Sequence, residues 1–178
     1  MPLYKNLILI LLMFTNSELF SFEEGVAKNN NVEIYYRDYG PLDGDPILLV
    51  QGLGGQLINW PEHLIEFLID NNFRPIVFDN RDTGLSSRIS SDSFTDEKRG
   101  NTIIRSYIRY YLRLPIQSEY IIDDMANDAI SVLDELNIDK AHILGISMGG
   151  MIAQIIASSH PASCLLYTSP SPRDLDLS

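Results

Sequence analysis

The stretch Gly145-Ile146-Ser147-Met148-Gly149-Gly150 decides the fold. It follows a short apolar run at residues 142–144 and precedes a run typical of a helix at residues 151–157. Glycines on both sides of Ser147 leave room for a sharp strand-to-helix turn, in which the serine backbone is strained and its Oγ stands clear of the sheet. The start of the following helix would offer free N–H groups to an oxygen that becomes negative during acyl transfer. The stretch therefore predicts a nucleophile elbow with Ser147 at its tip; the alternative is a glycine-rich helix start without chemistry.

The rest of the chain predicts strands that alternate with helices. The apolar run at residues 47–50 is expected for a strand buried on both faces. The predicted strands are 32–39, 47–50, 75–78 and 142–144. The predicted helices are one capped by Asn59 and stopped at Asn71, one over 102–114, one over 123–136 and one after Ser147. This alternation predicts an α/β fold with a mostly parallel sheet and helices on its faces.

A second glycine-rich loop, Gln51-Gly52-Leu53-Gly54-Gly55, comes directly after the strand at residues 47–50. In an open α/β sheet, sites form beyond the carboxyl ends of the strands, and this loop and Ser147 both follow such ends. The backbone N–H groups of Leu53 and Met148 are therefore expected to form an oxyanion hole, in which each donor is typically worth about 10²–10³ in rate. The alternative is that the loop is only a flexible turn.

Four stretches carry a resemblance to a known family: Gln51-Gly52-Leu53-Gly54-Gly55, Asp79-Asn80-Arg81-Asp82-Thr83-Gly84-Leu85-Ser86, Asp123-Asp124-Met125-Ala126, and Gly145-Ile146-Ser147-Met148-Gly149-Gly150 with Met151-Ile152-Ala153-Gln154. Together they resemble the first half of an α/β-hydrolase, close to the esterase, methylesterase and haloperoxidase-like members. The resemblance implies that Ser147 is the nucleophile and that the amides of Leu53 and Met148 form the oxyanion hole. Four glycines would support this site: Gly52, Gly145, Gly149 and Gly150. No cofactor and no metal are implied.

Two positions depart from the pattern of that family. Gln51 stands where a histidine is usual before the glycine of the oxyanion loop, which puts the orientation of the loop in question. Asp82 stands where glycine is common, so the turn that contains it is expected to differ. In the family this second segment supports the site, and Asp79 and Arg81 are accordingly predicted to be structural.

The sequence does not supply the proton-transfer partners of Ser147. In the family the acid and then the histidine follow the serine, and nothing after Ser147 is a credible pair. His142 is expected about 16 Å away along its strand, and His160 about 20 Å away along the next helix. His63 remains only a weak candidate for the base.

The predicted function is a serine hydrolase that acts on small carboxylic esters by acyl transfer to water. Residues 1–178 alone are predicted to be a fragment without useful turnover, truncated after the helix of the elbow. The alternative is a non-catalytic α/β module that binds a small acyl ligand or a partner. The net charge of −11 argues against a nucleic-acid partner, since phosphates require a basic surface.

The two ends of the chain are predicted to lie outside the domain, which is assigned to residues 31–163. Lys5 followed by an apolar run at 7–14 predicts a signal peptide over residues 1–21 and export to the periplasm or medium. The run is too short for a stable membrane span, although an uncleaved anchor is the alternative. Residues 164–178 resemble translated sequencing adapter, so they are predicted to be a non-native tail that contains the only cysteine, Cys164.

Overall fold

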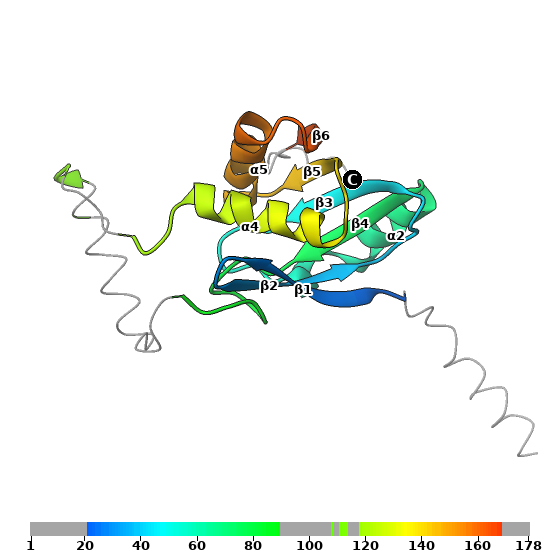
Figure 1. Ribbon diagram of the computed structural model, residues 1–178, viewed down its shortest axis with the longest axis horizontal. Coiled ribbons are helices and arrows are strands. Elements are labelled where there is room, and N and C mark those ends of the chain that lie inside the picture. Colours follow the sequence, from blue (N-terminus) through cyan, green and yellow to red (C-terminus); the bar gives the residue numbers. More distant parts are fainter. Residues whose placement is uncertain (1–20, 90–107, 109–110, 114–117, 169–178) are drawn as a thin grey trace, which may run out of the picture.

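The structure is a computed structural model that describes residues 21–89, 108, 111–113 and 118–168. Within these residues, six strands form one sheet in the order β1-β2-β4-β3-β5-β6 (Figure 1). The strands are β1 Glu23–Asn29, β2 Val32–Asp38, β3 Asp45–Val50, β4 Phe73–Phe78, β5 Ala141–Gly145 and β6 Cys164–Thr168. The helical elements are η1 Leu57–Asn59, α2 Glu62–Asp70, α4 Ile122–Glu135 and α5 Met148–Ser159.

The sheet is mixed but mostly parallel, which confirms the predicted α/β class. β3 lies at its centre and pairs in parallel with β4 on one side and with β5 on the other. β5 also pairs in parallel with β6. The two antiparallel pairings join β1 to β2 and β2 to β4, at one edge of the sheet.

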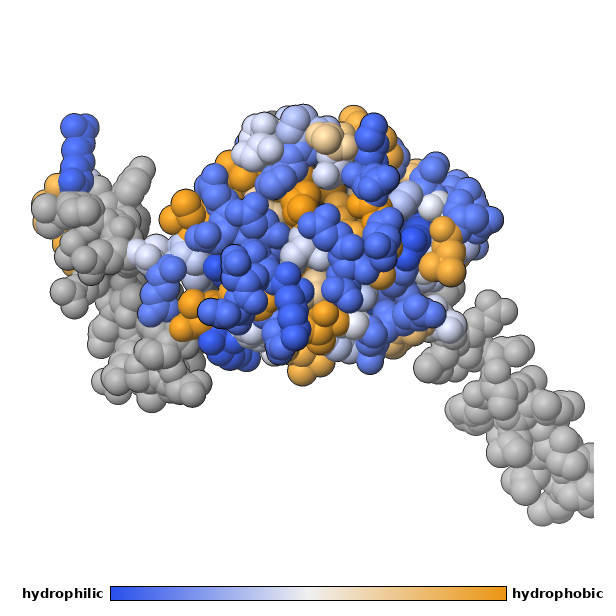
Figure 2. All heavy atoms as spheres, in the orientation of Figure 1, coloured by the Kyte–Doolittle hydropathy of each residue, from blue (hydrophilic) through white to orange (hydrophobic). Residues whose placement is uncertain are grey.

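Each face of the sheet is covered by helices, and the side chains of β3 alternate between the two faces. Leu48 and Val50 belong to the apolar cluster that packs under α4 and α5. Ile47 and Leu49 belong to the cluster that packs against η1 and α2. The outward side of α4 carries mostly hydrophilic side chains (Figure 2). The apolar run of β3 is therefore buried on both faces, as predicted.

The sequence did not predict β1. This strand pairs with the whole of β2, from Glu23 opposite Asp38 to Asn29 opposite Val32. It contributes only Ala27 to the buried core, and most of its other side chains are polar or exposed. The ordered fold consequently begins before residue 31, where the domain was predicted to start.

β6 occupies residues that the sequence analysis placed outside the domain. Cys164 pairs with Ala141 and Thr168 with Leu144, so the backbone extends the sheet by one strand. The strand is largely exposed, and burial of Cys164 raises the pKa of its thiol. The origin of residues 164–178 stays a prediction, and residues 169–178 lie outside the described residues.

The start of α2 differs from the prediction. Pro61 takes the N-cap position, whereas Asn59 belongs to η1, where its Oδ1 accepts a 2.7 Å hydrogen bond from the N–H of Gln56. Most of the helix predicted over 102–114 and nearly all of the predicted signal peptide lie outside the described residues. Among the helices that are described, none has the length and apolar character needed to cross a membrane.

Candidate active site

Ser147 sits between the end of β5 and the start of α5, with its side chain exposed. Its backbone has φ 54° and ψ −120°, which is a costly conformation for a residue with a side chain. Two backbone hydrogen bonds hold the turn. The N–H of Gly149 donates to the carbonyl oxygen of Ile146 at 2.9 Å, and the N–H of Gly150 donates to the carbonyl oxygen of Ser147 at 2.9 Å. The turn has the strained geometry that the sequence predicted, while the role of Ser147 as nucleophile stays a prediction.

Two glycines let α5 pack directly against the sheet. A Cβ on Gly145 would lie 2.1 Å from the carbonyl oxygen of Gly149. A Cβ on Gly149 would lie 2.1 Å from the carbonyl oxygen of Val50, at the end of β3. Because both obstacles are backbone atoms of buried elements, neither position accepts a side chain without a shift of the elbow. The close approach therefore fixes where Ser147 stands relative to β3.

Replacing Gly149 by alanine is expected to destabilise the fold. Overpacking typically costs about 1–3 kcal/mol, and we expect the upper end because the added methyl meets the backbone of the central strand. Urea denaturation measures this loss. Gly54→Ala is the matched control, since nothing lies within 4 Å of its added Cβ and only its φ of +73° opposes the change. Equal losses for the two variants would contradict the packing argument.

The loop after β3 meets Ser147 at the point where the strand order reverses. The chain passes from β3 to β4 on one side and later returns to β5 on the other, where Val50 pairs with Gly145. Ligand sites in open α/β sheets lie at such a switch point. A Cβ on Gly52 would lie 3.2 Å from the Cβ of Ser147 and 3.7 Å from its Oγ. The structure thus brings the glycine-rich loop and Ser147 together.

The two amides predicted for the oxyanion hole lie on either side of this contact. Leu53 directly follows Gly52, and its N–H donates to no acceptor among the described residues. Met148 is the first residue of α5, where N–H groups have no acceptor within the helix. Both N–H groups are thereby free to bind an external oxygen, although their role as an oxyanion hole stays a prediction.

The segment after β4 supports this end of the sheet. Asp79 accepts hydrogen bonds from the N–H of Leu57 at 2.7 Å and of Leu85 at 2.9 Å. Arg81 forms a two-point ion pair with Asp128 of α4, with Nε–Oδ2 at 2.6 Å and Nη2–Oδ1 at 2.8 Å. These buried contacts fit the structural role predicted for Asp79 and Arg81. The sequence analysis missed Asp128 as the partner.

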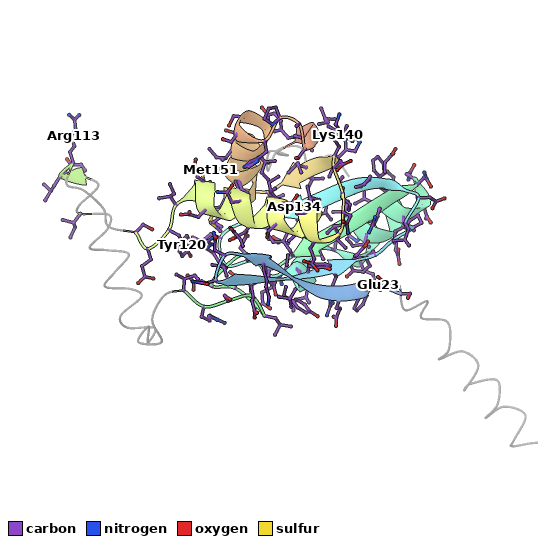
Figure 3. All side chains as sticks on the ribbon, in the orientation of Figure 1. Glu23, Arg113, Tyr120, Asp134, Lys140 and Met151 are labelled. Atoms are coloured by element: carbon purple, nitrogen blue, oxygen red, sulfur yellow. The ribbon has the colours of Figure 1, made fainter. Side chains whose placement is uncertain are left out.

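The parallel strands β3, β4 and β5 run in one direction, so their carboxyl ends lie at the same edge of the sheet. The site lies at that edge. Figure 3 shows Tyr120, which precedes α4, and Met151, which lies on the first turn of α5, towards the same end. Asp134 and Lys140, which precede β5, lie towards the other end. The carboxyl ends of β3 and β5 are therefore on the side of Tyr120 and Met151.

Comparison with known proteins decides the family. The family model described as alpha/beta hydrolase fold matches residues 45–177. The chain belongs to the alpha/beta hydrolase fold family. It is 29% identical over 156 residues to rhodomycin D methylesterase DnrP of Streptomyces peucetius, covering 88% of this chain and 40% of that protein. It is 26% identical over 134 residues to a non-heme chloroperoxidase of Burkholderia pyrrocinia, covering 75% of this chain and 38% of that protein.

Two solved structures are similar to this chain in fold. An N-acyl homoserine lactone degrading enzyme matches with a TM-score of 0.59 and 26% identity, covering 82% of this chain and 44% of that one. Epoxide hydrolase A from Mycobacterium thermoresistibile matches with a TM-score of 0.63 and 20% identity, covering 87% of this chain and 42% of that one. The chain spans about two fifths of the length of the curated relatives that it matches, 38% and 40% for two of them.

The three histidines of this alpha/beta hydrolase chain lie outside the elbow. His142 packs edge-on against Phe73, the first residue of β4, at the amino end of the sheet. His160 follows α5, and its Nε2 lies 3.1 Å from Oδ1 of Asn127. His63 is exposed on α2, which packs on the opposite face of the sheet from α5. Within the described chain, no hydrogen bond joins any of them to Ser147.

The two departures from the alpha/beta hydrolase pattern have local explanations. Asp82 adopts φ 63°, a left-handed conformation in which glycine is the easier residue. Its Oδ1 accepts a 2.6 Å bond from the N–H of Ile89. Burial and a hydrogen bond with Asp82 raise the pKa of the Tyr120 hydroxyl to about 12. Gln51 is buried, and a Cβ on Gly55 would lie 2.8 Å from its Oε1, so the glutamine side chain packs beneath the loop.

Among the described residues, no three histidine, cysteine, aspartate or glutamate side chains are grouped so that they could hold an ion.

Proposed function

We propose that the protein containing this chain is a serine hydrolase that cleaves small carboxylic esters. The observation that carries the proposal is the position of Ser147, exposed on a strained elbow at the topological switch point, with Gly52 of the glycine-rich loop against it. The start of α5 adds the positive end of a helix dipole at the same place. A methylesterase and a lactone-degrading enzyme among the similar proteins support hydrolysis of an acyl compound.

In the proposed reaction, the Oγ of Ser147 attacks the carbonyl carbon of the ester. The carbonyl oxygen becomes negative and accepts hydrogen bonds from the backbone N–H groups of Leu53 and Met148. The alcohol leaves with a proton, and water then releases the acid from the acyl-serine. The groups that move the protons are assigned to no residue of this chain, because no hydrogen bond joins its histidines to Ser147 among the described residues. The proposal involves no metal and no cofactor.

A fluorophosphonate probe tests the proposal on the full-length protein. We expect one covalent adduct on the peptide that contains Ser147, since such probes need an activated serine beside an oxyanion hole. Ser147→Ala is expected to abolish the adduct, whereas Ser159→Ala, at the exposed far end of the same helix, leaves it unchanged. Absence of labelling on a well-folded protein would favour the non-catalytic acyl-binding module instead.

We further propose that residues 1–21 direct export of the protein. The support is the sequence pattern alone, a lysine followed by a short apolar run. Expression of the full-length protein with a C-terminal tag and mass spectrometry of the mature N-terminus tests it. We expect a protein outside the cytoplasm that starts near residue 22. An intact N-terminus in the cytoplasmic fraction would overturn this proposal without affecting the hydrolase proposal.

A further inference from the structure

We propose that Asn80 is a positioning residue that sets the orientation of the loop carrying the Leu53 amide. This inference rests on the proposed function, because it concerns the oxyanion hole of that reaction. Asn80 does not touch the reacting atoms; it acts through the backbone of Gln51. The buried amide of Asn80 has no other role in the proposed reaction.

The contact that carries the inference is a hydrogen bond between neighbouring strand ends. The Nδ2 of Asn80, just past β4, donates to the carbonyl oxygen of Gln51, just past β3, at 3.2 Å. Asn80 is 2% exposed and Gln51 is 5% exposed, so this bond is shielded from water. The Gln51 carbonyl belongs to the peptide that enters Gly52, and the next peptide carries the N–H of Leu53. A rotation of the Gln51 carbonyl would therefore turn the Leu53 amide.

The other end of the same loop is held by the residue next to Asn80. Oδ1 of Asp79 accepts the N–H of Leu57 at 2.7 Å. Two consecutive side chains of the β4 end thus anchor both ends of the segment 51–57. Between the anchors, one backbone hydrogen bond crosses the turn within the described residues, from the N–H of Gly55 to the carbonyl oxygen of Gly52 at 3.1 Å. Because glycine-rich segments have wide conformational freedom, the anchors decide the loop geometry.

Stability alone does not account for an asparagine at this position. Its Oδ1 is buried and has no hydrogen-bond partner among the described residues. An unsatisfied buried acceptor is destabilising, and an apolar side chain of similar shape would avoid that cost. The reverse amide orientation would place Oδ1 against the Gln51 carbonyl oxygen, so the donor faces the loop. The hydrogen bond from Nδ2 to the Gln51 carbonyl oxygen therefore explains why an asparagine stands at position 80.

The test compares Asn80→Asp with Asn71→Asp in the full-length protein. Both remove an Nδ2 donor to a backbone carbonyl, since Asn71 donates to Phe67 at 2.7 Å at the exposed end of α2. For Asn80→Asp we expect kcat for a p-nitrophenyl ester to fall about 10- to 100-fold, as for a small misplacement of a catalytic group, with KM nearly unchanged. Inactivation by fluorophosphonate is expected to slow by a similar factor. Asn71→Asp is expected to change neither rate.

A second variant covers the case in which Asn80→Asp does not fold. Asn80→Ala removes the donor without adding a charge, and we expect the same loss of kcat and of inactivation rate at a temperature where it is folded. A lower melting temperature with unchanged kcat and inactivation rate would overturn this inference and leave the hydrolase proposal standing. A wild-type protein that reacts with neither the ester nor the probe would overturn both.

Discussion

Replacing Ser147 by alanine is expected to lower kcat for ester hydrolysis by about 10⁶-fold in the full-length protein, the loss measured when the catalytic serine of subtilisin is removed. The reason is that, among the described residues, Ser147 alone combines exposure, a strained elbow and the start of α5. Without its Oγ, no acyl-enzyme forms, and any remaining acceleration comes from the free amides of the loop and helix.

The same variant is expected to keep its stability, which makes the rate loss interpretable. Serine and alanine have a similar conformational cost at φ 54°, and within the described part of the chain the Ser147 side chain makes no hydrogen bond that alanine would remove. Steady-state kinetics with a p-nitrophenyl ester and a thermal melt measure the two quantities. Ser159→Ala is the control of the same chemistry on the same helix. More than about 1% residual kcat in Ser147→Ala would show that another group is the nucleophile.

Replacing Asp128 by alanine is expected to lower the free energy of unfolding by about 3–5 kcal/mol, because it leaves a buried charge unpaired. Asp128 is fully buried and accepts both Nε and Nη2 of Arg81. It also accepts the Nδ2 of Asn29 at 2.8 Å, so one carboxylate ties β1, the loop after β4 and α4 together. The carboxylate raises the pKa of Arg81, which stays charged when its partner is lost.

Urea denaturation of three variants tests the role of this pair. Asp128→Ala is expected to have the largest loss of unfolding free energy, because the Arg81 charge stays buried without its partner. The double variant Arg81→Met with Asp128→Leu is expected to recover most of the loss, since it removes both charges. Glu24→Gln, which breaks the exposed pair with Arg37, is expected to change stability little. A small loss in Asp128→Ala would mean that water reaches the buried pair.

The sequence predicted those elements whose local residue pattern matches their burial and packing in the fold. The run 47–50 is apolar throughout because β3 is buried on both faces and central in the sheet. The elbow was visible because close packing at Gly145 and Gly149 leaves no room for side chains, which imposes residue types that the sequence displays. In the loop 51–55 the reasons differ, because Gly52 lies close to Ser147 whereas Gly54 has open space and a φ of +73°.

Other features depend on partners that no local pattern reveals. β1 is mostly polar and becomes a strand through its pairing with β2. In the sequence, Asp128 resembles the other acidic residues of a solvent-exposed helix. Its burial is favourable because it pairs with Arg81, which lies on a loop distant in sequence. Asn59 is a residue type that often caps helices, but here it belongs to η1, and its side chain accepts a hydrogen bond from the N–H of Gln56. The helix over 102–114 and the signal peptide stay predictions, since they fall mostly outside the described residues.

The central place of β3 bears on how the chain folds as it leaves the ribosome. β4 follows β3 closely, but the partner on the other side arrives late, because Ile47 pairs with His142, about 95 residues further on. At about 5–20 residues per second, roughly 5–20 s pass before β5 is made. Throughout this interval the most apolar strand keeps one edge open to other chains. A nascent chain that stalls before residue 140 is therefore the species most in need of a chaperone.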